Sequence, residues 1–245
     1  MRIAILGDVH SNLPALRRVI DAARRESIDH WVQVGDVVGY GAEPRECIDL
    51  LRSLGATVCI GNHDAAVLGM LDASYFNHYA RVAIDWTRSQ LRTQDIQYLK
   101  SLPFVVEHHE YTLTHGTLRM PEQFGYVLTV VEAKESLRRQ KTRMGFVGHS
   151  HVPAVYLERT DHADLDAMYA PELETSTEHC HKVLMNVGSV GQPRDEDPRA
   201  AFAIYDTDRQ RIWIRRVEYD IAAAQRTILA AGLPDVLARR LDLGV

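Results

Sequence analysis

The sequence has few cysteines, and they are not arranged as a framework. Its 245 residues include only Cys47, Cys59 and Cys180. Because their number is odd and no Cys-x-x-Cys spacing occurs, neither a disulfide scaffold nor a cysteine-type zinc site is expected. This cysteine usage is typical of a reduced, cytoplasmic protein.

Long apolar runs are also lacking. No stretch approaches the roughly 20 apolar residues that a membrane-spanning helix requires. The first ten residues, MRIAILGDVH, contain a short apolar run that ends at Gly7-Asp8. A secretory signal needs about 7–15 apolar residues, so this run predicts a first core strand and not a signal peptide. We therefore expect no membrane partner.

Positive charge is not concentrated anywhere in the chain. Lys and Arg number 28 against 33 Asp and Glu, a formal net charge of −5. Proteins that live on long nucleic acid usually carry a basic stripe, so we expect no such partner. The composition remains compatible with a short nucleotide substrate. With 46% hydrophobic and 25% charged residues, it is that of an ordinary globular protein.

What the chain does contain is an alternation of strand and helix patterns. Apolar runs that end in glycine predict strands at residues 2–6, 30–34 and 57–60. Helical patterns follow the first two strands, from Leu13 to Ala23 and over residues 44–54. This order indicates an α/β sheet with parallel βαβ crossovers.

The remainder of the chain extends this pattern. Two helices are predicted within residues 80–101, a helical tail over residues 222–241, and an exposed excursion at the polar segment 160–181. Without a repeat or a linker, residues 1–245 are expected to form a single domain. Further strands are predicted at residues 104–108, 111–114, 145–147, 154–157, 182–186, 201–205 and 211–217, the last two as an antiparallel hairpin.

Five loops place Asp, Asn or His directly after an apolar run. Ligands of open α/β sheets bind at the carboxyl ends of strands, so these loops are expected to meet in one crevice. Two loops carry pairs spaced i, i+2, which an extended segment would direct to the same side. The loops are Gly7-Asp8-Val9-His10, Gly35-Asp36, Gly61-Asn62-His63-Asp64, Thr114-His115-Gly116 and Gly148-His149-Ser150-His151.

The side chains in these loops are metal ligands by type. Carboxylate, imidazole and amide groups without thiolate suit Mn, Fe, Zn, Co or Ni. One carboxylate with two oxygens can bridge two such ions. Gly-Asp or Thr-His-Gly alone is more typical of a turn or a hydrogen-bonded histidine, and Asp-x-His is common by chance. GNHD and GHSH are stronger evidence, because polar residues at a buried strand end are costly without partners. The five motifs together indicate one site.

The order Asp-x-His, Gly-Asp, Gly-Asn-His-Asp, a lone histidine after a strand, and Gly-His-Ser-His resembles the signature of the calcineurin-like metallophosphoesterase superfamily. Every block is present between Asp8 and His151. The resemblance implies an α/β fold, a four-layer α/β/β/α sandwich of two mixed sheets flanked by helices. It also implies a hydrolase of phosphate esters that uses two divalent metal ions.

The resemblance assigns roles to single residues. His63 would lie beside the metals as general acid, and a hydroxide bridging the two ions would attack phosphorus in line. Asp64 would orient His63 or cap the next helix, and the cap is the better interpretation. One ion would be held by Asp8, His10, Asp36 and His151, and the other by Asp36, Asn62, His115 and His149, with Asp36 bridging.

A narrower resemblance rests on three segments, namely GDVHSN, GDVVGYG and the NVGSVGQPRD run that begins at Asn186. These are similar to compact bacterial phosphodiesterases and diadenosine-tetraphosphatase-like enzymes. Protein phosphatases of the superfamily carry GDxHG and GDxVDRG, whereas Ser11 and Gly39-Tyr40-Gly41 stand here. We therefore expect a small phosphorylated substrate, and a phosphodiester above a monoester.

Three residues are candidate substrate contacts, each with a structural alternative. Arg194 would hold the scissile phosphate or pair with Asp195 or Asp197 at the surface. Asn12 would hold phosphate or, as is more typical, cap its helix. Tyr40 would line the pocket or lie in a solvated loop.

Other functions on the same fold are a non-catalytic scaffold, a protein or nucleotide phosphatase, and a nuclease. A scaffold typically loses ligands, and here every ligand position is filled. The acidic charge balance and the missing basic stripe disfavour a nuclease.

Overall fold

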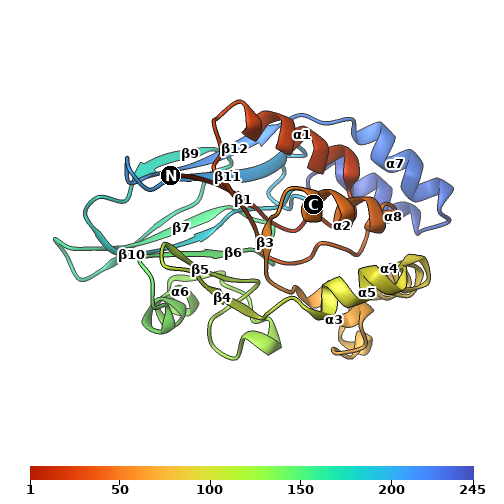
Figure 1. The fold of residues 1–245 in the computed structure, drawn as a ribbon, viewed down its shortest axis with the longest axis horizontal. Coiled ribbons are helices and arrows are strands. Elements are labelled where there is room, and N and C mark those ends of the chain that lie inside the picture. Colours follow the sequence, from red (N-terminus) through yellow and green to blue (C-terminus); the bar gives the residue numbers. More distant parts are fainter.

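Two six-stranded sheets pack face to face in the computed structural model, which describes residues 1–245, and helices cover both outer faces (Figure 1). Sheet A has the order β3-β2-β1-β11-β12-β9. Its first three strands are parallel and the others antiparallel, which confirms the predicted crossovers and the late hairpin. The strands are β1 (Arg2–Leu6), β2 (His30–Gln33), β3 (Thr57–Val58), β9 (Leu173–Ser176), β11 (Ala200–Asp206) and β12 (Arg211–Val217).

Sheet B has the order β4-β5-β6-β10-β7-β8 and is also mixed. Strands β5, β6 and β10 run parallel to one another, and the outer strands are antiparallel to their neighbours. The strands are β4 (Val105–Glu107), β5 (Tyr111–Thr114), β6 (Met144–Val147), β7 (Ala154–Arg159), β8 (Leu165–Met168) and β10 (Cys180–Asn186).

Alternation along the strands builds two separate apolar layers. In β1, Ile3 and Ile5 join the layer between the sheets, where they meet Phe146 of sheet B. Ala4 and Leu6 point to the other side and pack beneath helices. Because successive side chains of a strand face opposite ways, one short strand serves both layers.

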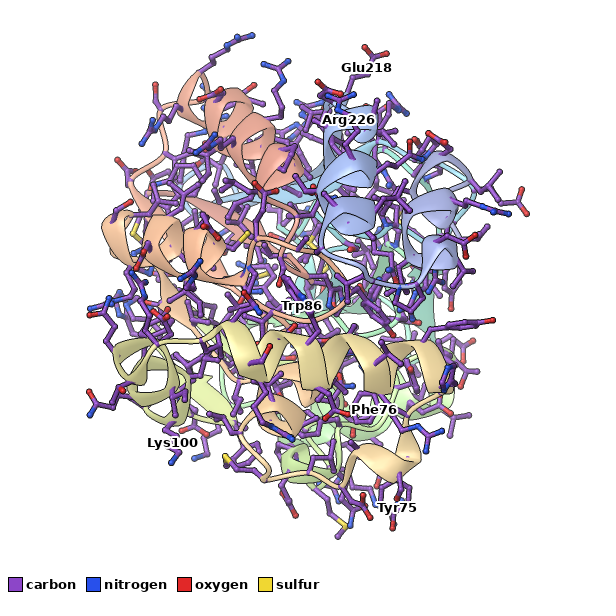
Figure 2. All side chains as sticks on the ribbon, turned by 90° about the vertical axis from the view of Figure 1, so that its right-hand side faces the viewer. Tyr75, Phe76, Trp86, Lys100, Glu218 and Arg226 are labelled. Carbon is purple, nitrogen blue, oxygen red and sulfur yellow. The ribbon has the colours of Figure 1, made fainter.

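Helices complete a four-layer α/β/β/α sandwich, which confirms the predicted fold class. Sheet A is covered by α1 (Leu13–Arg24), α2 (Pro44–Ser53), α7 (Ile221–Ala230) and α8 (Asp235–Arg239), and sheet B by α6 (Val130–Arg139). Figure 2 shows α4 crossing one side of the molecule below α7 and α8. None of the helices combines the length and the apolar character needed to cross a membrane. The remaining elements are α3 (Asn62–Val67), α4 (His78–Gln90), α5 (Thr93–Lys100), η1 (Ala73–Tyr75), η2 (Pro121–Gln123) and η3 (Arg240–Asp242).

The segment 160–181 is largely exposed, as predicted, with only Thr177 and Cys180 buried, but the prediction that it is an excursion from the sheets is wrong. This segment supplies β8 to sheet B and β9 to sheet A, at an edge of each sheet. An edge strand has one neighbour and much solvent contact, so its composition stays polar and its periodicity weak. That is why the sequence pattern does not distinguish it from a loop.

Arg216 of β12 fastens the loop after β10 to sheet A. Its side chain is fully buried. The guanidinium donates to the carbonyl oxygens of Pro171 and Arg199, at 3.0 Å each, and forms an ion pair with Asp195. Asp195 directly follows Arg194, so this anchor also helps to position that residue.

Replacing Arg216 should therefore destabilise the fold. Arg216→Met leaves Asp195 without its partner, and we expect the free energy of unfolding in urea to fall by about 3–5 kcal/mol. Arg211→Met is the matched control on the same strand. Arg211 pairs with Glu174 at 2.6 Å, but both side chains are 47% exposed, so its loss should stay below about 1 kcal/mol. Equal losses in the two variants would contradict the anchoring role.

Candidate metal centre

The predicted ligand residues come together at one end of the sheets. Asp8 and His10 follow β1, Asp36 follows β2, and His115 follows β5. The remaining three follow β3 and β6, and all seven are buried. Parallel strands bring their carboxyl ends to the same edge, so five loops distant in sequence converge there, as the sequence predicts.

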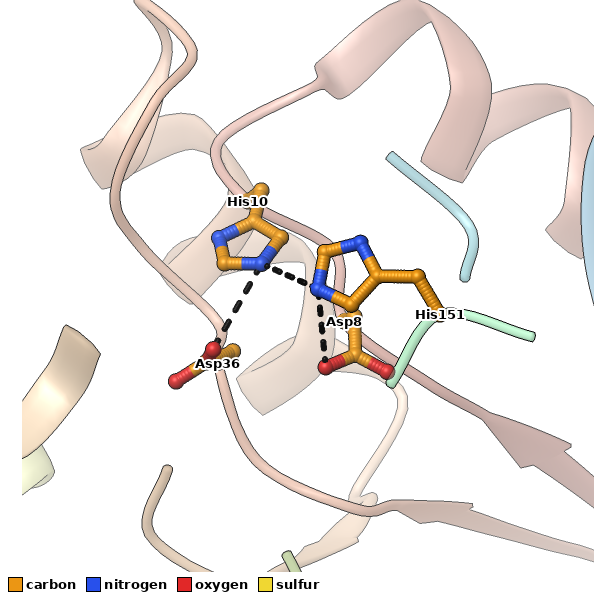
Figure 3. Close-up of side chains that lie close together, drawn as sticks. All are labelled: Asp8, His10, Asp36 and His151. Atoms are coloured by element: carbon orange, nitrogen blue, oxygen red, sulfur yellow. Dashed lines mark hydrogen bonds and ion pairs between the residues drawn. The ribbon is translucent and has the colours of Figure 1, made fainter. Parts of the chain in front are cut away.

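One group consists of Asp8, His10, Asp36 and His151, whose donor atoms all lie within 4.8 Å of one another. Figure 3 shows the four side chains pointing to a common centre. The Nε2 atoms of His10 and His151 are 3.1 Å apart. His10 Nε2 lies 3.4 Å from an oxygen of Asp36, and His151 Nε2 lies 3.5 Å from an oxygen of Asp8.

A second group consists of Asp36, His115 and His149. His115 Nε2 lies 3.1 Å from His149 Nδ1 and 2.9 Å from the amide oxygen of Asn62. The same Asp36 oxygen that faces His10 is 3.3 Å from His115 Nε2. Asp36 is thus shared by both groups, which is the position that a bridging carboxylate occupies.

The hydrogen bonds of the imidazole rings define which nitrogens face the centre. Three histidines donate from Nδ1 to a backbone carbonyl, which can only accept, so Nδ1 carries a hydrogen in each; in the neutral rings of His10 and His151, Nε2 then keeps its lone pair. The lone pairs of His10 and His151 then face each other at 3.1 Å. Such an arrangement is favourable only around a shared cation, so the donor set fits a metal ion. The three bonds are His10 to Val38 (3.1 Å), His115 to Val34 (2.8 Å) and His151 to Gln192 (2.5 Å).

The protein itself supplies little positive charge to this buried site. Burial lowers the pKa of His10, His149 and His151 well below the usual range. Burial opposes the charge of His115 as well, but the neighbouring Asp36 carboxylate outweighs it and holds the pKa of His115 at about 9. Burial raises the pKa of Asp8 to about 7. A single imidazolium therefore supplies the positive charge that divalent cations would provide.

The ligand loops are held in strained backbone conformations. Five ligand residues are in the left-handed region, which residues other than glycine avoid at a cost of order 1–3 kcal/mol. The expectation that Asp8 and His10 lie on one extended segment is wrong. Both are left-handed, and the curl of the loop, not strand alternation, turns their side chains to the same centre. The φ angles are 42° at Asp8, 48° at His10, 56° at Asp36, 69° at His149 and 62° at His151.

Two glycines allow these loops to approach closely. A Cβ at Gly61 would lie 2.1 Å from a carboxylate oxygen of Asp36. A Cβ at Gly148 would lie 2.6 Å from a carboxylate oxygen of Asp8. Any side chain at either position would displace a ligand, so glycine is required there for steric reasons.

His63 lies beside the two groups and belongs to neither. Its backbone N–H donates to Asp36 at 2.8 Å. The ring is packed among Tyr40, His10 and Phe76, with ring centres 4.4–4.9 Å apart. Nδ1 is buried and has no hydrogen-bond partner, so Nε2 is the nitrogen available to the cavity. Burial lowers the pKa of His63 to about 4.

The Asp64 carboxylate forms no hydrogen bond with the His63 ring. Its carboxylate accepts hydrogen bonds from the backbone N–H groups of Gly61 (3.0 Å), Val38 (3.0 Å) and Val37 (3.3 Å). Asp64 is the third residue of α3, and its bond to Gly61 is that of a capping box. Asp64 thus caps the N-terminus of a helix, as the favoured interpretation predicted, but it does so from the third position of α3, and the N-cap residue itself is Gly61. The same carboxylate also fastens the loop that carries Asp36 to the first turn of α3.

A cavity of about 740 Å³ opens over the site, a volume that suits a small-molecule ligand. Arg194 and Tyr40 both line it, together with His63. Asp195 and Asp197 do not pair with Arg194, because they bind Arg216 and Arg199. Arg194 is bonded only to neutral oxygens, at 3.0 Å to Gln192 and 3.5 Å to Tyr40. Its guanidinium is thus free to meet an anion.

Asn12 has a structural role. Its side-chain oxygen accepts from Ala15 at 3.1 Å and caps α1. Its amide nitrogen donates to the Gly191 carbonyl at 2.9 Å and to the Tyr219 hydroxyl at 3.3 Å. These bonds occupy the side chain, so we do not include Asn12 among the proposed substrate contacts.

Tyr126 and Arg240 are among the cavity residues that the sequence motifs did not identify. The Tyr126 ring stacks on the His149 ring, with centres 3.8 Å apart and planes at 15°. Arg240 lines the cavity from η3, near the end of the chain. Tyr126 lies in a loop without periodicity, and Arg240 lies 89 positions beyond His151 in the numbering. No local pattern connects either residue with the ligand loops.

Comparison with known proteins agrees with this geometry. The family model described as "Calcineurin-like phosphoesterase superfamily domain" matches residues 1–210. An uncharacterised protein of Methanocaldococcus jannaschii is 36% identical, over 99% of this chain and 98% of the relative. The structure of a metallophosphoesterase from Sphaerobacter thermophilus is 40% identical, covers 100% of this chain and 99% of its own, and superposes with a TM-score of 0.88. A hypothetical protein from Pyrococcus horikoshii shares the fold at 20% identity and a TM-score of 0.81, covering 100% and 98% of the two chains.

The fastening role of Asp64 can be tested with an isosteric change. Asp64→Asn replaces an acceptor oxygen by a donor, so at least one buried N–H loses its partner, and unfolding in urea should become easier by about 1–3 kcal/mol. Asp72→Asn is the control, because Asp72 caps the exposed η1 with a single bond to Ser74. A smaller loss in Asp64→Asn than in the control would contradict the assignment.

Proposed function

The chain belongs to the calcineurin-like phosphoesterase superfamily and is thus a hydrolase of phosphate esters, and we propose that it is a phosphodiesterase for small molecules. The observation that carries the proposal is the pair of buried donor groups that share Asp36. Members of this superfamily depend on two metal ions, and the cluster offers two adjacent places for them.

We assign the metal ligands as the family pattern implies. Asp8, His10, Asp36 and His151 would hold one ion, and Asp36, Asn62, His115 and His149 the other. This nitrogen and oxygen set suits Mn, Fe, Zn, Co or Ni. When bound, two such ions neutralise phosphoryl charge and activate water for attack on phosphorus.

The chain's own groups would orient the ester and move the proton. Arg194 reaches the cavity without a carboxylate partner and would bind a phosphoryl oxygen. Nε2 of His63 would donate a proton to the leaving oxygen. In the free protein the ring is neutral, because burial holds its pKa at about 4. A bound phosphate anion places negative charge beside the ring and raises this pKa toward the working range.

A small ester fits this site better than a polymer. The cavity is bounded by aromatic residues, among them Tyr75, Phe76 and Tyr126, which would pack against an organic substituent. In Figure 2, Tyr75 lies at the edge of the molecule and Phe76 further in. The missing basic stripe disfavours a nuclease, and the complete ligand set disfavours a scaffold. We also propose a cytoplasmic location, since all three cysteines are free and buried, and a single domain.

Metal content should follow the two groups of ligands. Purified protein loaded with Mn²⁺ and desalted should contain two ions per chain by plasma emission spectrometry. His151→Ala removes a ligand of one group and should leave about one ion. Asp36→Asn affects both groups and should leave fewer than one. Asp49→Asn, an exposed carboxylate on α2, is the control and should keep both. Full metal content in Asp36→Asn would exclude the shared ligand.

The acid role of His63 predicts a dependence on the leaving group. In His63→Ala, kcat should fall by about 10²–10⁴-fold for an alkyl phosphodiester, whose leaving alkoxide needs a proton. The loss should be clearly smaller for bis-p-nitrophenyl phosphate, whose leaving group departs unprotonated.

Two controls make this comparison specific. The metal content of His63→Ala should equal that of the native protein, and His109→Ala, an exposed histidine with 74% of its side chain accessible, should behave like the native protein. An equal loss on both esters would assign His63 to phosphate binding instead.

A further inference from the structure

Two arginines of the cavity share one aromatic ring. The guanidinium carbon of Arg194 lies 5.8 Å from the centre of the Tyr40 ring, and that of Arg240 lies 5.9 Å from it. The Tyr40 ring is buried and also packs against the rings of His63 and His10. Tyr40 thus places two cations next to each other at the rim of the metal centre.

Neither cation is paired with an Asp or Glu side chain, since none lies within ion-pair distance of Arg194 or Arg240. Nε of Arg194 is buried without any partner. Nε of Arg240 donates to the main-chain oxygen of Val245, the last residue of the sequence, at 2.5 Å, and its two Nη groups make no hydrogen bond. Burial, and then the charge of Arg194, lowers the pKa of Arg240.

Two half-buried like charges with unused donors are unfavourable by themselves. They become favourable when an anion accepts their hydrogen bonds, since guanidinium groups bind carboxylate and phosphate oxygens in a fixed, two-pronged geometry. The donors that remain unused, Nε of Arg194 and both Nη groups of Arg240, can therefore bind an anion that enters the cavity.

The two arginines approach the site differently. Arg194 is attached directly to a candidate ligand, since its backbone N–H donates to the His151 carbonyl at 3.4 Å. Arg240 lines the same cavity through Tyr40 and forms no hydrogen bond with a candidate ligand. It belongs to η3, beyond the residues 1–210 that match the family model.

We propose that Arg240, with Arg194, forms a subsite for a second anionic group of the substrate, one step outward from the scissile phosphate. The preferred substrate is then a phosphoester that carries a further carboxylate or phosphate on its organic substituent. This inference rests on the proposed function, and Arg240 acts in it as a specificity-determining residue.

The test compares two diesters with the same leaving group. One is p-nitrophenyl phenyl phosphate, and the other carries a carboxylate on the phenyl ring, at the meta or para position. Release of p-nitrophenolate from the metal-loaded protein gives kcat/KM for both. We expect the native protein to prefer the carboxylated diester by about tenfold, the effect of one charge-assisted contact. In Arg240→Gln this preference should fall to about one, and Arg240→Lys should restore part of it.

Arg239→Gln is the matched control. Arg239 is the adjacent residue, with a 78% exposed side chain paired to Asp235, and its replacement should keep the preference. An unchanged preference in Arg240→Gln, or none in the native protein, would overturn the subsite.

A binding measurement separates this inference from the proposed function. Calorimetry with phenylphosphonate and carboxyphenylphosphonate needs no turnover. Suppose that the native protein hydrolyses neither diester but binds carboxyphenylphosphonate more tightly than phenylphosphonate, and that Arg240→Gln binds the two equally. The subsite would then stand, and the phosphodiesterase proposal would fail. If the native protein hydrolyses both diesters, and neither it nor Arg240→Gln distinguishes the two phosphonates, the phosphodiesterase proposal would stand and the subsite would fail.

Discussion

Burial of several ionisable groups at one point is the constraint on which the rest of the structure depends. Two carboxylates and four imidazoles meet where water is largely excluded. Such groups are stable there only when each has a partner and when the total charge is balanced. In the protein alone, one imidazolium provides the balancing charge, which His115 shows through its raised pKa. Metal ions would provide it more completely.

Holding the donor atoms in place requires support from outside the ligand set. Backbone carbonyls accept hydrogen bonds from Nδ1 of three histidines and so orient their rings, and Asp64 binds three backbone N–H groups around the Asp36 loop. The loop after β10 contributes from a different direction, through Gln192 behind His151. These contacts maintain the left-handed ligand residues, which would relax if the surroundings did not hold them.

The layer between the sheets and the helical layer over sheet A contribute differently to the site. The apolar layer between the sheets fixes the strand ends, and so the ligand positions. The helices that cover sheet A have a second effect. Because α7 packs on α1 and α8 packs on α7, the chain end returns to the mouth of the cavity and Arg240 lies beside Tyr40. The metal ligands thus come from the core loops and a cation of the rim from the periphery, which allows the rim to vary without disturbing the centre.

The sequence by itself determined most of the strand order, the parallel βαβ crossovers and the set of residues that meet at the site, whereas the four-layer fold class came from the family resemblance of its motifs. It could do so because the candidate ligands lie within a few residues of the apolar run of a strand, and such a local pattern can be recognised in the sequence. Edge strands β8 and β9 escaped it, since solvent contact removes the apolar alternation on which such a prediction depends.

Only the tertiary structure decided how the groups are used. It showed that Asn12 and Asp64 serve the backbone, that Arg194 lacks a carboxylate partner, and that Arg240 and Tyr126 line the cavity. Each of these facts depends on which distant residue satisfies a hydrogen bond or a charge. That choice is made by packing between segments far apart in the chain, so no window of sequence contains it.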